Sequence, residues 1–263
     1  MKNKKNTELA VCGLAAVKAL GKEHPEKIKR FYYEEGRAGV FGDLCKYLAK
    51  NKIPYNKVEA EDLEKLCGSV HHQGVVAMID ESKPIEVTKA IVDSWILHKE
   101  KILLLDRIGN ANNLGAIVRS AAFFGIHHII LPMHESQSMI TTSSYRVAQG
   151  GMEYVTIYSL RSIIRFLQEI KGKITRVGTD VRSKMPVKDL SKVCNDKAIL
   201  LILGNEEQGI SSLVKENCDY LTVIPSAFML QNPNEENWDI FPVESLNVAQ
   251  AASVILYEMS KES

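Results

Sequence analysis

Two continuous aliphatic runs, KILLLD (101–106) and AILLILG (198–204), limit most strongly what this chain can fold into. A strand with one face in water alternates apolar and polar residues, whereas these runs are apolar at nearly every position. Such runs are typical of strands buried on both faces, as in a parallel sheet covered by helices. We therefore expect both segments in the interior of an α/β sheet.

Strand-like and helix-like segments alternate around these two runs. Further strands are expected at 127–131, 175–180 and 221–225, and helices near 113–125, 159–170 and 211–218. This alternation is typical of an α/β domain with a mainly parallel sheet. Residues 226–243 interrupt it, and their proline, asparagine and scattered aromatic residues predict a long ordered loop before the last helix.

The first part of the chain has a mixed pattern. Strands are expected at 28–33 and 75–79, and helices near 8–20, 42–51 and 60–67. The charged stretch 80–90 contains Pro84 and is typical of a linker. Because 263 residues exceed a typical single domain, we predict a smaller N-terminal domain of residues 1–82, a boundary segment of residues 83–98 and a larger domain of residues 99–263.

The cysteines and the apolar segments bear on the compartment. The five cysteines are odd in number and form no C-x-x-C pair, which argues against a disulfide framework and a zinc site. The histidine pairs at 71–72 and 127–128 lack further ligands at metal-binding spacing, so no metal is expected. Glu8 and Lys18 interrupt the apolar N-terminal stretch, and no run approaches the roughly 20 apolar residues of a membrane span. A cytoplasmic protein without a membrane partner is therefore expected.

The charge is unevenly distributed along the chain. Residues 1–57 hold 13 lysine and arginine residues against six aspartate and glutamate residues, whereas the remainder holds 20 against 26. The basic first part points to a polyanion-binding surface. A solvated, lysine-rich surface explains the same composition, so both interpretations stay open.

The stretch NNLGAIVRSAAFFG (112–125) predicts an amphipathic helix whose apolar stripe begins at Leu114. Asn113 is placed to cap its start. Gly115 and Arg119 lie one turn apart beside the stripe. Glycine costs roughly 1 kcal/mol in a helix relative to alanine, so its expected function is to provide space. Either a ligand approaches the Arg119 guanidinium there, or Gly115 lets two elements pack while Arg119 pairs with a surface carboxylate.

Two further segments carry polar residues at the ends of apolar elements. LILGNEEQGIS (201–211) runs from a buried strand into a polar turn, where open α/β sheets bind ligands. It lacks the lysine of a P-loop, and the chain contains no G-x-G-x-x-G. ESLNVAQAASVILYE (244–258) predicts a helix with Ser245 and Asn247 at its start, where free N–H groups bind caps, carboxylates or phosphates.

Together these three segments resemble the motifs of the SpoU (TrmH-like) family of RNA ribose 2′-O-methyltransferases, in the SPOUT superfamily. The matching residues follow the family's order: Asn113, Leu114, Gly115, Ala116 and Arg119; then Leu203, Gly204, Asn205, Glu206 and Gly209; then Ser245, Leu246, Asn247 and Val248. VCGLAAVKAL (11–20) and VHHQGVVAMI (70–79) resemble the family's small substrate-binding domain. The resemblance covers nearly the whole chain.

The resemblance implies an α/β fold with a C-terminal trefoil-knotted, parallel-sheet methyltransferase domain and a smaller N-terminal α/β domain that binds the substrate. It further implies S-adenosylmethionine as cofactor and a homodimer with the active site at the subunit interface. The implied catalytic residues are Asn113, Arg119, Glu206, Ser245 and Asn247. The implied cofactor-binding residues are Leu203, Gly204, Asn205, Gly209, Ile224, Pro225, Leu246, Asn247 and Val248. The expected reaction is methyl transfer to a ribose 2′-hydroxyl of structured RNA, rRNA in preference to tRNA, and not to DNA.

The roles of these residues follow from the same resemblance. The family residue that matches Arg119 is a proposed base or activator of the hydroxyl. Because arginine stays protonated, we favour a role in which Arg119 holds the adjacent phosphate and stabilises the developing alkoxide. Asn113 and Glu206 are expected to orient substrate and arginine, and Ser245 and Asn247 to shape the cofactor end.

The chain also departs from the family pattern. The family commonly has an Asp-Pro turn before the residue matching Asn113, where this chain has GNANN. After Pro225 the family continues with Met and a short connection, whereas here Ser226 opens the 226–243 insertion, which either covers or obstructs the cofactor pocket. A catalytically silent RNA-binding homologue is therefore the second hypothesis. A third, a nucleotide-binding enzyme outside the family, has only the G-x-x-x-x-G turn in its favour.

Overall fold

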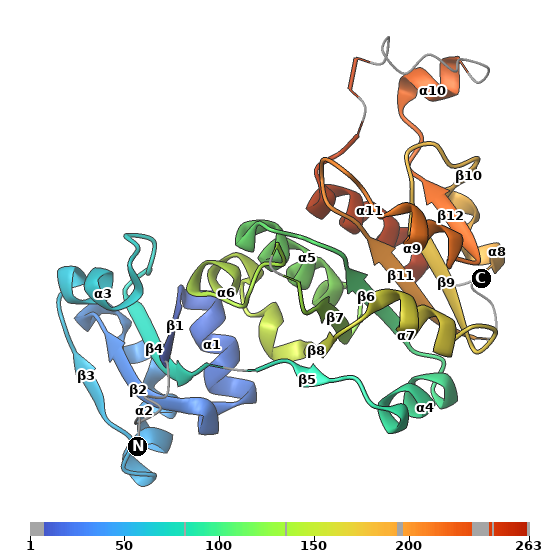
Figure 1. Ribbon diagram of the computed structural model, residues 1–263. Coiled ribbons are helices and arrows are strands. Elements are labelled where there is room, and N and C mark those ends of the chain that lie inside the picture. The colour runs from blue at the N-terminus through green and yellow to red at the C-terminus, as the bar shows by residue number, and fades with distance from the viewer. Residues whose placement is uncertain are drawn as a thin grey trace.

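The strands of the protein form two sheets of different size (Figure 1). The computed structural model describes residues 8–81, 83–134, 136–193, 197–232, 242–243 and 245–261. The smaller sheet has the strand order β1-β4-β2-β3, and the larger one has the order β10-β12-β9-β11-β6-β7-β8-β5. The strands of the smaller sheet are β1 (Glu8–Cys12), β2 (Ile28–Tyr33), β3 (Tyr55–Lys57) and β4 (Val75–Asp80). The strands of the larger sheet are β5 (Ile85–Glu86), β6 (Lys101–Leu105), β7 (His128–Pro132), β8 (Thr156–Leu160), β9 (Ile174–Thr179), β10 (Met185–Pro186), β11 (Ala198–Leu203) and β12 (Tyr220–Val223).

All neighbouring strands of the larger sheet run parallel, which confirms the predicted α/β class. The two aliphatic runs are β6 and β11, which pair with each other in the interior of the sheet. Side chains alternate between the faces of a strand, so Leu103 and Leu105 enter one core while Ile102 and Leu104 enter the other. Both runs are apolar throughout because both of their faces are buried.

Helices cover both faces of the larger sheet. On the Leu103 face lie α5 (Ala111–Phe123), α8 (Leu190–Val193) and α11 (Val248–Ser260). On the opposite face lie α4 (Lys89–Leu97), α7 (Ile163–Glu169) and α9 (Ser212–Glu216). The remaining helices of the described residues are α1 (Leu14–Glu23), α2 (Gly42–Lys50), α3 (Ala60–Cys67), α6 (Thr142–Ala148) and α10 (Ala227–Gln231). Four short 3₁₀ segments are η1 (Pro25–Lys27), η2 (Glu35–Phe41), η3 (Gly151–Tyr154) and η4 (Val187–Asp189).

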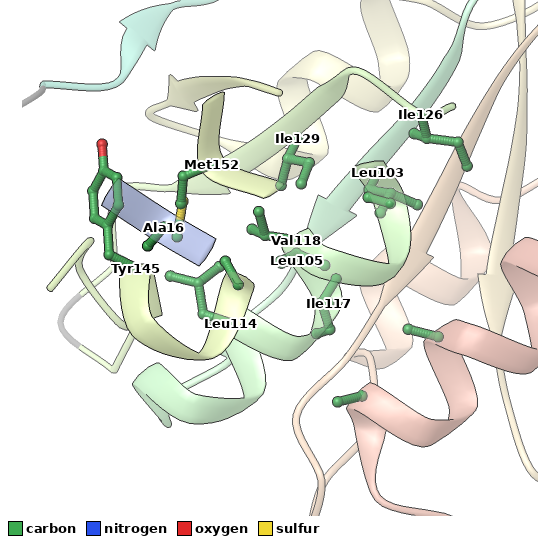
Figure 2. Packing of buried hydrophobic residues seen from close by; sticks show 14 of the residues in the cluster. Ala16, Leu103, Leu105, Leu114, Ile117, Val118, Ile126, Ile129, Tyr145 and Met152 are labelled. Atoms are coloured by element: carbon green, nitrogen blue, oxygen red, sulfur yellow. The ribbon is translucent and has the colours of Figure 1, made fainter. Parts of the chain in front are cut away.

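The two sheets share one hydrophobic core at their junction, where α1 lies against α6 and η3 (Figure 1). Figure 2 shows Ala16 of α1 beside Tyr145 and Met152. At Gly150 a Cβ atom would lie only 2.7 Å from the Cβ of Ala19, so the glycine permits this close approach. The junction is therefore tightly packed.

Charged and polar pairs border the same junction. Lys27 forms a 3.1 Å ion pair with the buried carboxylate of Glu153, and the Tyr154 hydroxyl donates to Glu23 at 3.0 Å. Both pairs join the α1 region to η3. These two contacts restrain α1 from sliding along η3, in addition to the apolar packing that holds the two elements together.

Several expected boundaries are wrong. The helix expected near 8–20 begins only at Leu14, because Glu8–Cys12 pairs as β1 with β4 and Gly13 adopts a positive φ of 96°. The helix expected near 159–170 is preceded by β8, and it begins at Ile163. Apolar periodicity alone does not separate a short buried strand from the start of a helix.

Residues 83–98, expected as a boundary segment, contain regular structure that packs on the larger sheet. Here β5 pairs with β8, and α4 buries Trp95 in the second core. The segment expected as a long loop from Ser226 begins instead with α10, capped by the Ser226 hydroxyl. Residues 233–241 of that expected loop lie outside the described residues.

Candidate functional site

Polar residues gather where β6 and β11 end and where α11 begins. The two strands are adjacent and parallel, so their carboxyl ends lie at the same edge of the sheet. The backbone N–H of Asp106 donates to the carbonyl of Leu203 at 2.8 Å and continues the pairing past the end of β6. This edge is where open α/β sheets bind ligands.

Three side chains from distant segments form one hydrogen-bonded cluster at this edge. The Asn113 amide of α5 donates to the Glu206 carboxylate, and the Asn247 amide donates to the Asn113 carbonyl oxygen at 3.2 Å. Asn247 is also the N-cap of α11, since its side-chain oxygen accepts from the backbone N–H of Ala249 at 2.9 Å. The structure thus brings together one residue from each of the three motifs.

Asn113 is available to the cluster because it does not cap its helix, contrary to the sequence prediction. Helix α5 begins at Ala111, and Asn110 is its N-cap, accepting from the backbone N–H of Asn112 at 2.8 Å. Asn113 therefore lies within the first turn with its amide free to bind Glu206 and Asn247. A capping role would have used the carbonyl oxygen that accepts from Asn247.

In the turn after β11, the first residues, Gly204 and Asn205, lie directly against the last one, Gly209. A Cβ atom at Gly204 would lie 2.2 Å from the carbonyl carbon of Gly209, so only glycine fits there. The backbone N–H of Gly209 donates to the carbonyl of Asn205 at 2.8 Å, and Gly209 has a positive φ of 63°. The Asn205 side chain accepts from the backbone N–H groups of Glu207 and Gln208 at 2.9 and 3.2 Å. The turn consequently presents Glu206 to solvent from a fixed backbone.

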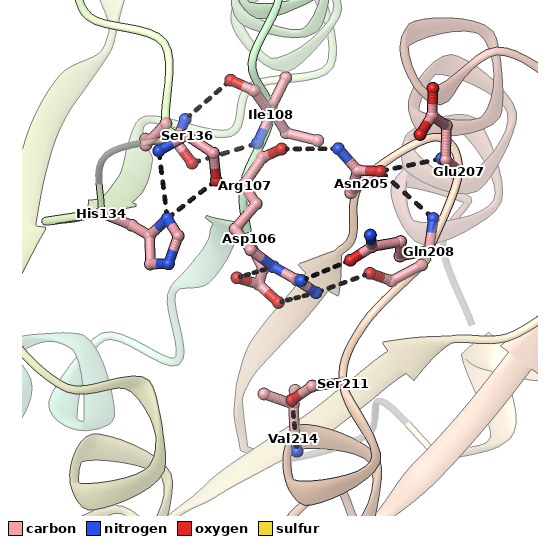
Figure 3. Close-up of polar contacts among 12 residues, drawn as sticks. Asp106, Arg107, Ile108, His134, Ser136, Asn205, Glu207, Gln208, Ser211 and Val214 are labelled. Atoms are coloured by element: carbon pink, nitrogen blue, oxygen red, sulfur yellow. Dashed lines mark hydrogen bonds and ion pairs between the residues drawn. The ribbon is translucent and has the colours of Figure 1, made fainter.

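Arg107, which the sequence analysis did not single out, fastens this turn to β6 (Figure 3). Its guanidinium donates to Gln208 Oε1 at 3.0 Å and to the Gly209 carbonyl at 3.1 Å, and it pairs with the buried Asp106. Its own carbonyl accepts from the Asn205 amide at 3.1 Å. Arg107 has a positive φ of 60°, which is unfavourable for a residue with a side chain. Its position just after a buried strand was the available signal.

Gly115 provides space for a helix. A Cβ atom there would lie 2.5 Å from the carbonyl oxygen of Ser144 and 2.9 Å from the Cβ of Val147, both in α6. The alternative in which Gly115 lets two elements pack is therefore the right one. A ligand does not occupy this gap, because α6 fills it.

Arg119 lies apart from the cluster. Its side chain is exposed, and among the described residues it has no ion pair or hydrogen bond, so the expected surface carboxylate is not seen there. Arg119 follows Asn113 by six residues, which corresponds to roughly 9 Å along the helix and about 240° around it. The two side chains therefore leave α5 from different faces.

The other candidate residues occupy several environments. Leu203 and Val248 are buried in the first core, and Ile224, just after β12, is half-buried against it. Pro225 is half-buried, and Leu246 is 45% exposed. Ser245 is exposed and forms no hydrogen bond with the described part of the chain, so it is not joined to the Asn113 cluster.

The cysteines lie away from this edge. The thiols of Cys12, Cys45, Cys67 and Cys218 are free. Burial raises the pKa of Cys12 to about 12 and the pKa of Cys218 to about 11, so both stay protonated near neutral pH. Within the ranges that the structure describes, no group of three His, Cys, Asp or Glu residues is arranged to hold a metal ion. No helix formed by those residues combines the length and the apolar character of a membrane span.

Comparison with known proteins gives this geometry a context. Residues 100–234 match the SpoU rRNA Methylase family, and residues 10–85 match the RNA 2′-O ribose methyltransferase substrate binding family. The 23S rRNA (guanosine-2′-O-)-methyltransferase RlmB of Acinetobacter baylyi is 30% identical over 256 residues, which cover 95% of this chain and 96% of that protein. The RlmB of Neisseria meningitidis serogroup B is 29% identical over 254 residues, which cover 96% of this chain and 94% of that protein.

Solved structures show the same fold. The SpoU methyltransferase AviRb from Streptomyces viridochromogenes, in complex with the cofactor AdoMet, has a TM-score of 0.67 at 24% identity and covers 96% of this chain and 88% of that one. An AdoMet-bound rRNA methyltransferase from Sinorhizobium meliloti has a TM-score of 0.71 at 20% identity and covers 95% and 86%. With a family model that matches most of the larger sheet and a relative 30% identical over nearly its full length, the chain belongs to the SpoU rRNA methylase family.

Proposed function

We propose that this protein transfers a methyl group from S-adenosylmethionine to a ribose 2′-hydroxyl of ribosomal RNA. The observation that carries the proposal is the Asn113–Glu206–Asn247 cluster, in which one residue from each of three family motifs meets at the carboxyl edge of a parallel sheet. The RlmB relatives act on guanosine of 23S rRNA, so 23S rRNA is the first substrate to test.

The residues at this edge fit S-adenosylmethionine in their chemistry. The closed Gly204–Gly209 turn and the residues Ile224, Pro225 and Leu246 would hold the cofactor, with apolar surface for the adenine and backbone groups for its polar atoms. The Glu206 carboxylate suits a neighbouring cation. When bound, the cofactor supplies an activated methyl group.

The side chains of the cluster would position the RNA. Asn113 has both amide atoms engaged, by Glu206 and Asn247, so its orientation is fixed before substrate arrives. Glu206 is exposed and would accept from a ribose hydroxyl or from a guanidinium. We assign Ser245 to the same end of the site, where its exposed hydroxyl would contact cofactor or RNA.

Arg119 would act from a second copy of the chain. A guanidinium holds a phosphate and stabilises a developing alkoxide, but Arg119 leaves α5 on a different face from Asn113. That face is apolar: Phe123 is 82% exposed and Tyr257 of α11 is 52% exposed. The Phe124 and Tyr257 rings contact each other, with centroids 6.2 Å apart, so the apolar surface continues from α5 to α11. A homodimer through α5 and α11 would bury it and bring the partner's arginine to the cluster.

The remaining parts of the family organisation belong to the same proposal. Residues 1–82 would bind the RNA, with residues 83–98 at the boundary and residues 99–263 forming a trefoil-knotted catalytic domain. The basic balance of residues 1–57 supports attraction of phosphates. The substrate would place the protein in the cytoplasm.

Methyl transfer to unmodified 23S rRNA tests the proposal, together with calorimetric titration by S-adenosylmethionine. We expect micromolar cofactor affinity and a labelled ribose. Arg119→Ala should lower the transfer rate at least about 100-fold and leave cofactor affinity unchanged, because it removes one charge that acts on the transition state. Arg165→Ala, which removes an exposed arginine of α7, is the control.

Two outcomes would contradict this assignment. Full transfer by Arg119→Ala would remove the proposed role of that arginine. Lack of cofactor binding in the wild-type protein, with RNA binding retained, would favour the catalytically silent homologue.

A further inference from the structure

An open cavity of about 600 Å³ lies between the β1 end of the smaller sheet and the start of α6 with the residues before it. One wall is formed by Glu8, Leu9 and the turn at Cys67–Ser69, and the other by residues 139–143 and Arg146. Its volume falls within the roughly 300–1,000 Å³ of sites that hold small organic ligands. The cavity is therefore large enough for a nucleotide.

Arg146 projects from α6 at this cavity, and none of the described residues forms an ion pair or a hydrogen bond with its guanidinium. Its side chain is partly buried, and its Cγ atom lies 3.9 Å from the position that a Cβ would take at Gly13. Throughout the described part of the chain, no carboxylate pairs with its guanidinium and no acceptor receives a hydrogen bond from it. A partly buried cation with five unused donors fits an anionic ligand.

The other polar groups at the cavity define what kind of anion fits. Glu8 forms an ion pair with Arg30, and Glu81 borders the cavity as well. Two carboxylates near one free arginine do not suit a row of phosphates. They suit one phosphate on Arg146, with a neutral ribose or base beside the hydroxyls of Thr142 and Ser143.

The cavity wall is hydrogen-bonded to the residue that precedes Asn113 in α5. The Ser143 hydroxyl at the cavity wall donates to the Asn112 side chain at 2.7 Å, and Asn112 precedes Asn113. An RNA chain with one ribose at Asn113 and Glu206 would then place a neighbouring nucleotide at this cavity. Single-stranded RNA is recognised when such neighbours are unstacked and held by arginine and by polar groups.

We propose that this cavity binds the nucleotide next to the methylated one, with its phosphate on Arg146. The inference rests on the proposed function and names a substrate-binding residue for the same reaction. Arg146 would raise affinity for RNA without contacting the methyl group. It belongs to the same chain as the Asn113 and Glu206 that it serves.

Steady-state methyl transfer to an unmodified 23S rRNA transcript tests the subsite. Arg146→Ala should raise KM for RNA roughly 10- to 100-fold, the usual effect of losing hydrogen bonds to a charged group, while kcat and cofactor affinity stay unchanged. Arg146→Lys should give an intermediate KM, because it keeps the charge and loses the planar fork. Arg165→Ala is the matched control, since it removes the same charge far from the cavity and should leave KM within about twofold.

A second variant fills the cavity and keeps Arg146. Thr142→Trp should raise KM for RNA in the same way, and calorimetry with S-adenosylmethionine verifies that the variant is folded. A KM for Arg146→Ala or Thr142→Trp equal to that of Arg165→Ala would overturn the subsite while the proposed function stands. Lack of ribose methylation by the wild-type protein would instead contradict the proposed function, and the subsite with it.

Discussion

At the scale of single residues, Gly115 is among the positions that tolerate an added side chain least, because it contacts the backbone of α6. An added Cβ would meet the Ser144 carbonyl oxygen at 2.5 Å, and this atom belongs to a helix backbone that cannot rotate away. Gly115→Ala should therefore destabilise the protein by roughly 1–3 kcal/mol despite the better helix propensity of alanine. Urea unfolding measures the change.

At a second glycine, the same substitution by alanine should change the stability in the opposite direction. Gly42 begins α2 with ordinary helical dihedral angles, and nothing lies within 4 Å of an added Cβ. Gly42→Ala should stabilise the protein by up to about 1 kcal/mol. If Gly115→Ala stabilised it by a similar amount, the close packing of α5 on α6 would be wrong.

Residue-level prediction from sequence succeeded where a residue type has few uses. A glycine in the middle of an apolar helix indicates space, and the structure shows which of two occupants fills it. Asn113 was expected to be a cap, because asparagine before an apolar stripe usually is one. The helix begins two residues earlier at Ala111, and this depends on Asn110, a competing cap of the same type. The sequence did not predict the role of Arg107, because a sequence does not show that a residue adopts a positive φ.

At the scale of elements, the turn after β11 depends on its attachment to β6. Arg107 donates to Gln208 and to the carbonyl of Gly209, so its side chain holds the far half of the turn against the end of β6. Arg107→Ala should weaken S-adenosylmethionine binding about tenfold or more, since hydrogen bonds from a charged group are lost and the turn loosens. Calorimetric titration gives the Kd.

Gln208→Ala is the control for the turn. It removes one of the contacts of Arg107 and leaves the contact with the Gly209 carbonyl, so its effect on Kd should be several times smaller. Equal cofactor affinity in Arg107→Ala and the wild-type protein would exclude the turn as a cofactor-binding element.

Elements differ in how far the sequence predicts them. The strands β6 and β11 and the helices α5 and α11 carry long, uniform patterns, and their burial agrees with these patterns. The two-residue strand β5 and the short helix α10 have no such pattern. Pairing with β8 defines β5, and the Ser226 cap begins α10. The pairing of β5 with β8 is a tertiary contact, which cannot be derived from local periodicity.

At the scale of the whole molecule, the separation of Arg119 from Asn113 makes a prediction about shared sites. If each active site combines Asn113 of one chain with Arg119 of the other, two inactive variants should complement each other. Mixing Arg119→Ala with Asn113→Ala at equal amounts, after exchange of subunits, should restore about a quarter of wild-type activity, because half of the dimers are mixed and each mixed dimer has one intact site.

The outcome separates two arrangements. A site built within one chain would give no recovery of activity, and this result would contradict the shared site in which Arg119 acts from the partner. Phe123→Glu serves as a control, because the Phe123 side chain of α5 is 82% exposed and a charge there should prevent dimer formation. Added to both variants of the mixture, it should yield monomers in sedimentation and abolish the recovery of activity.

The shape of the whole molecule was the least predictable from sequence. Composition and length indicated two parts, but the shared core of α1, α6 and η3 depends on Gly150 approaching Ala19, which no local pattern reveals. The proposed contribution of a partner's Arg119 to the site was expected only from the family resemblance, because it depends on which exposed surfaces meet.

The packed junction between the sheets also sets a rule for the substrate. Because Ala16, Tyr145 and Met152 lie in one continuous core, residues 8–80 are packed in a fixed position relative to the cluster at Asn113. The protein therefore holds these two parts at a fixed separation. If the smaller domain binds the RNA as proposed, the recognition feature of that RNA must lie at one set distance from the target ribose, and the RNA must bend to fit the protein.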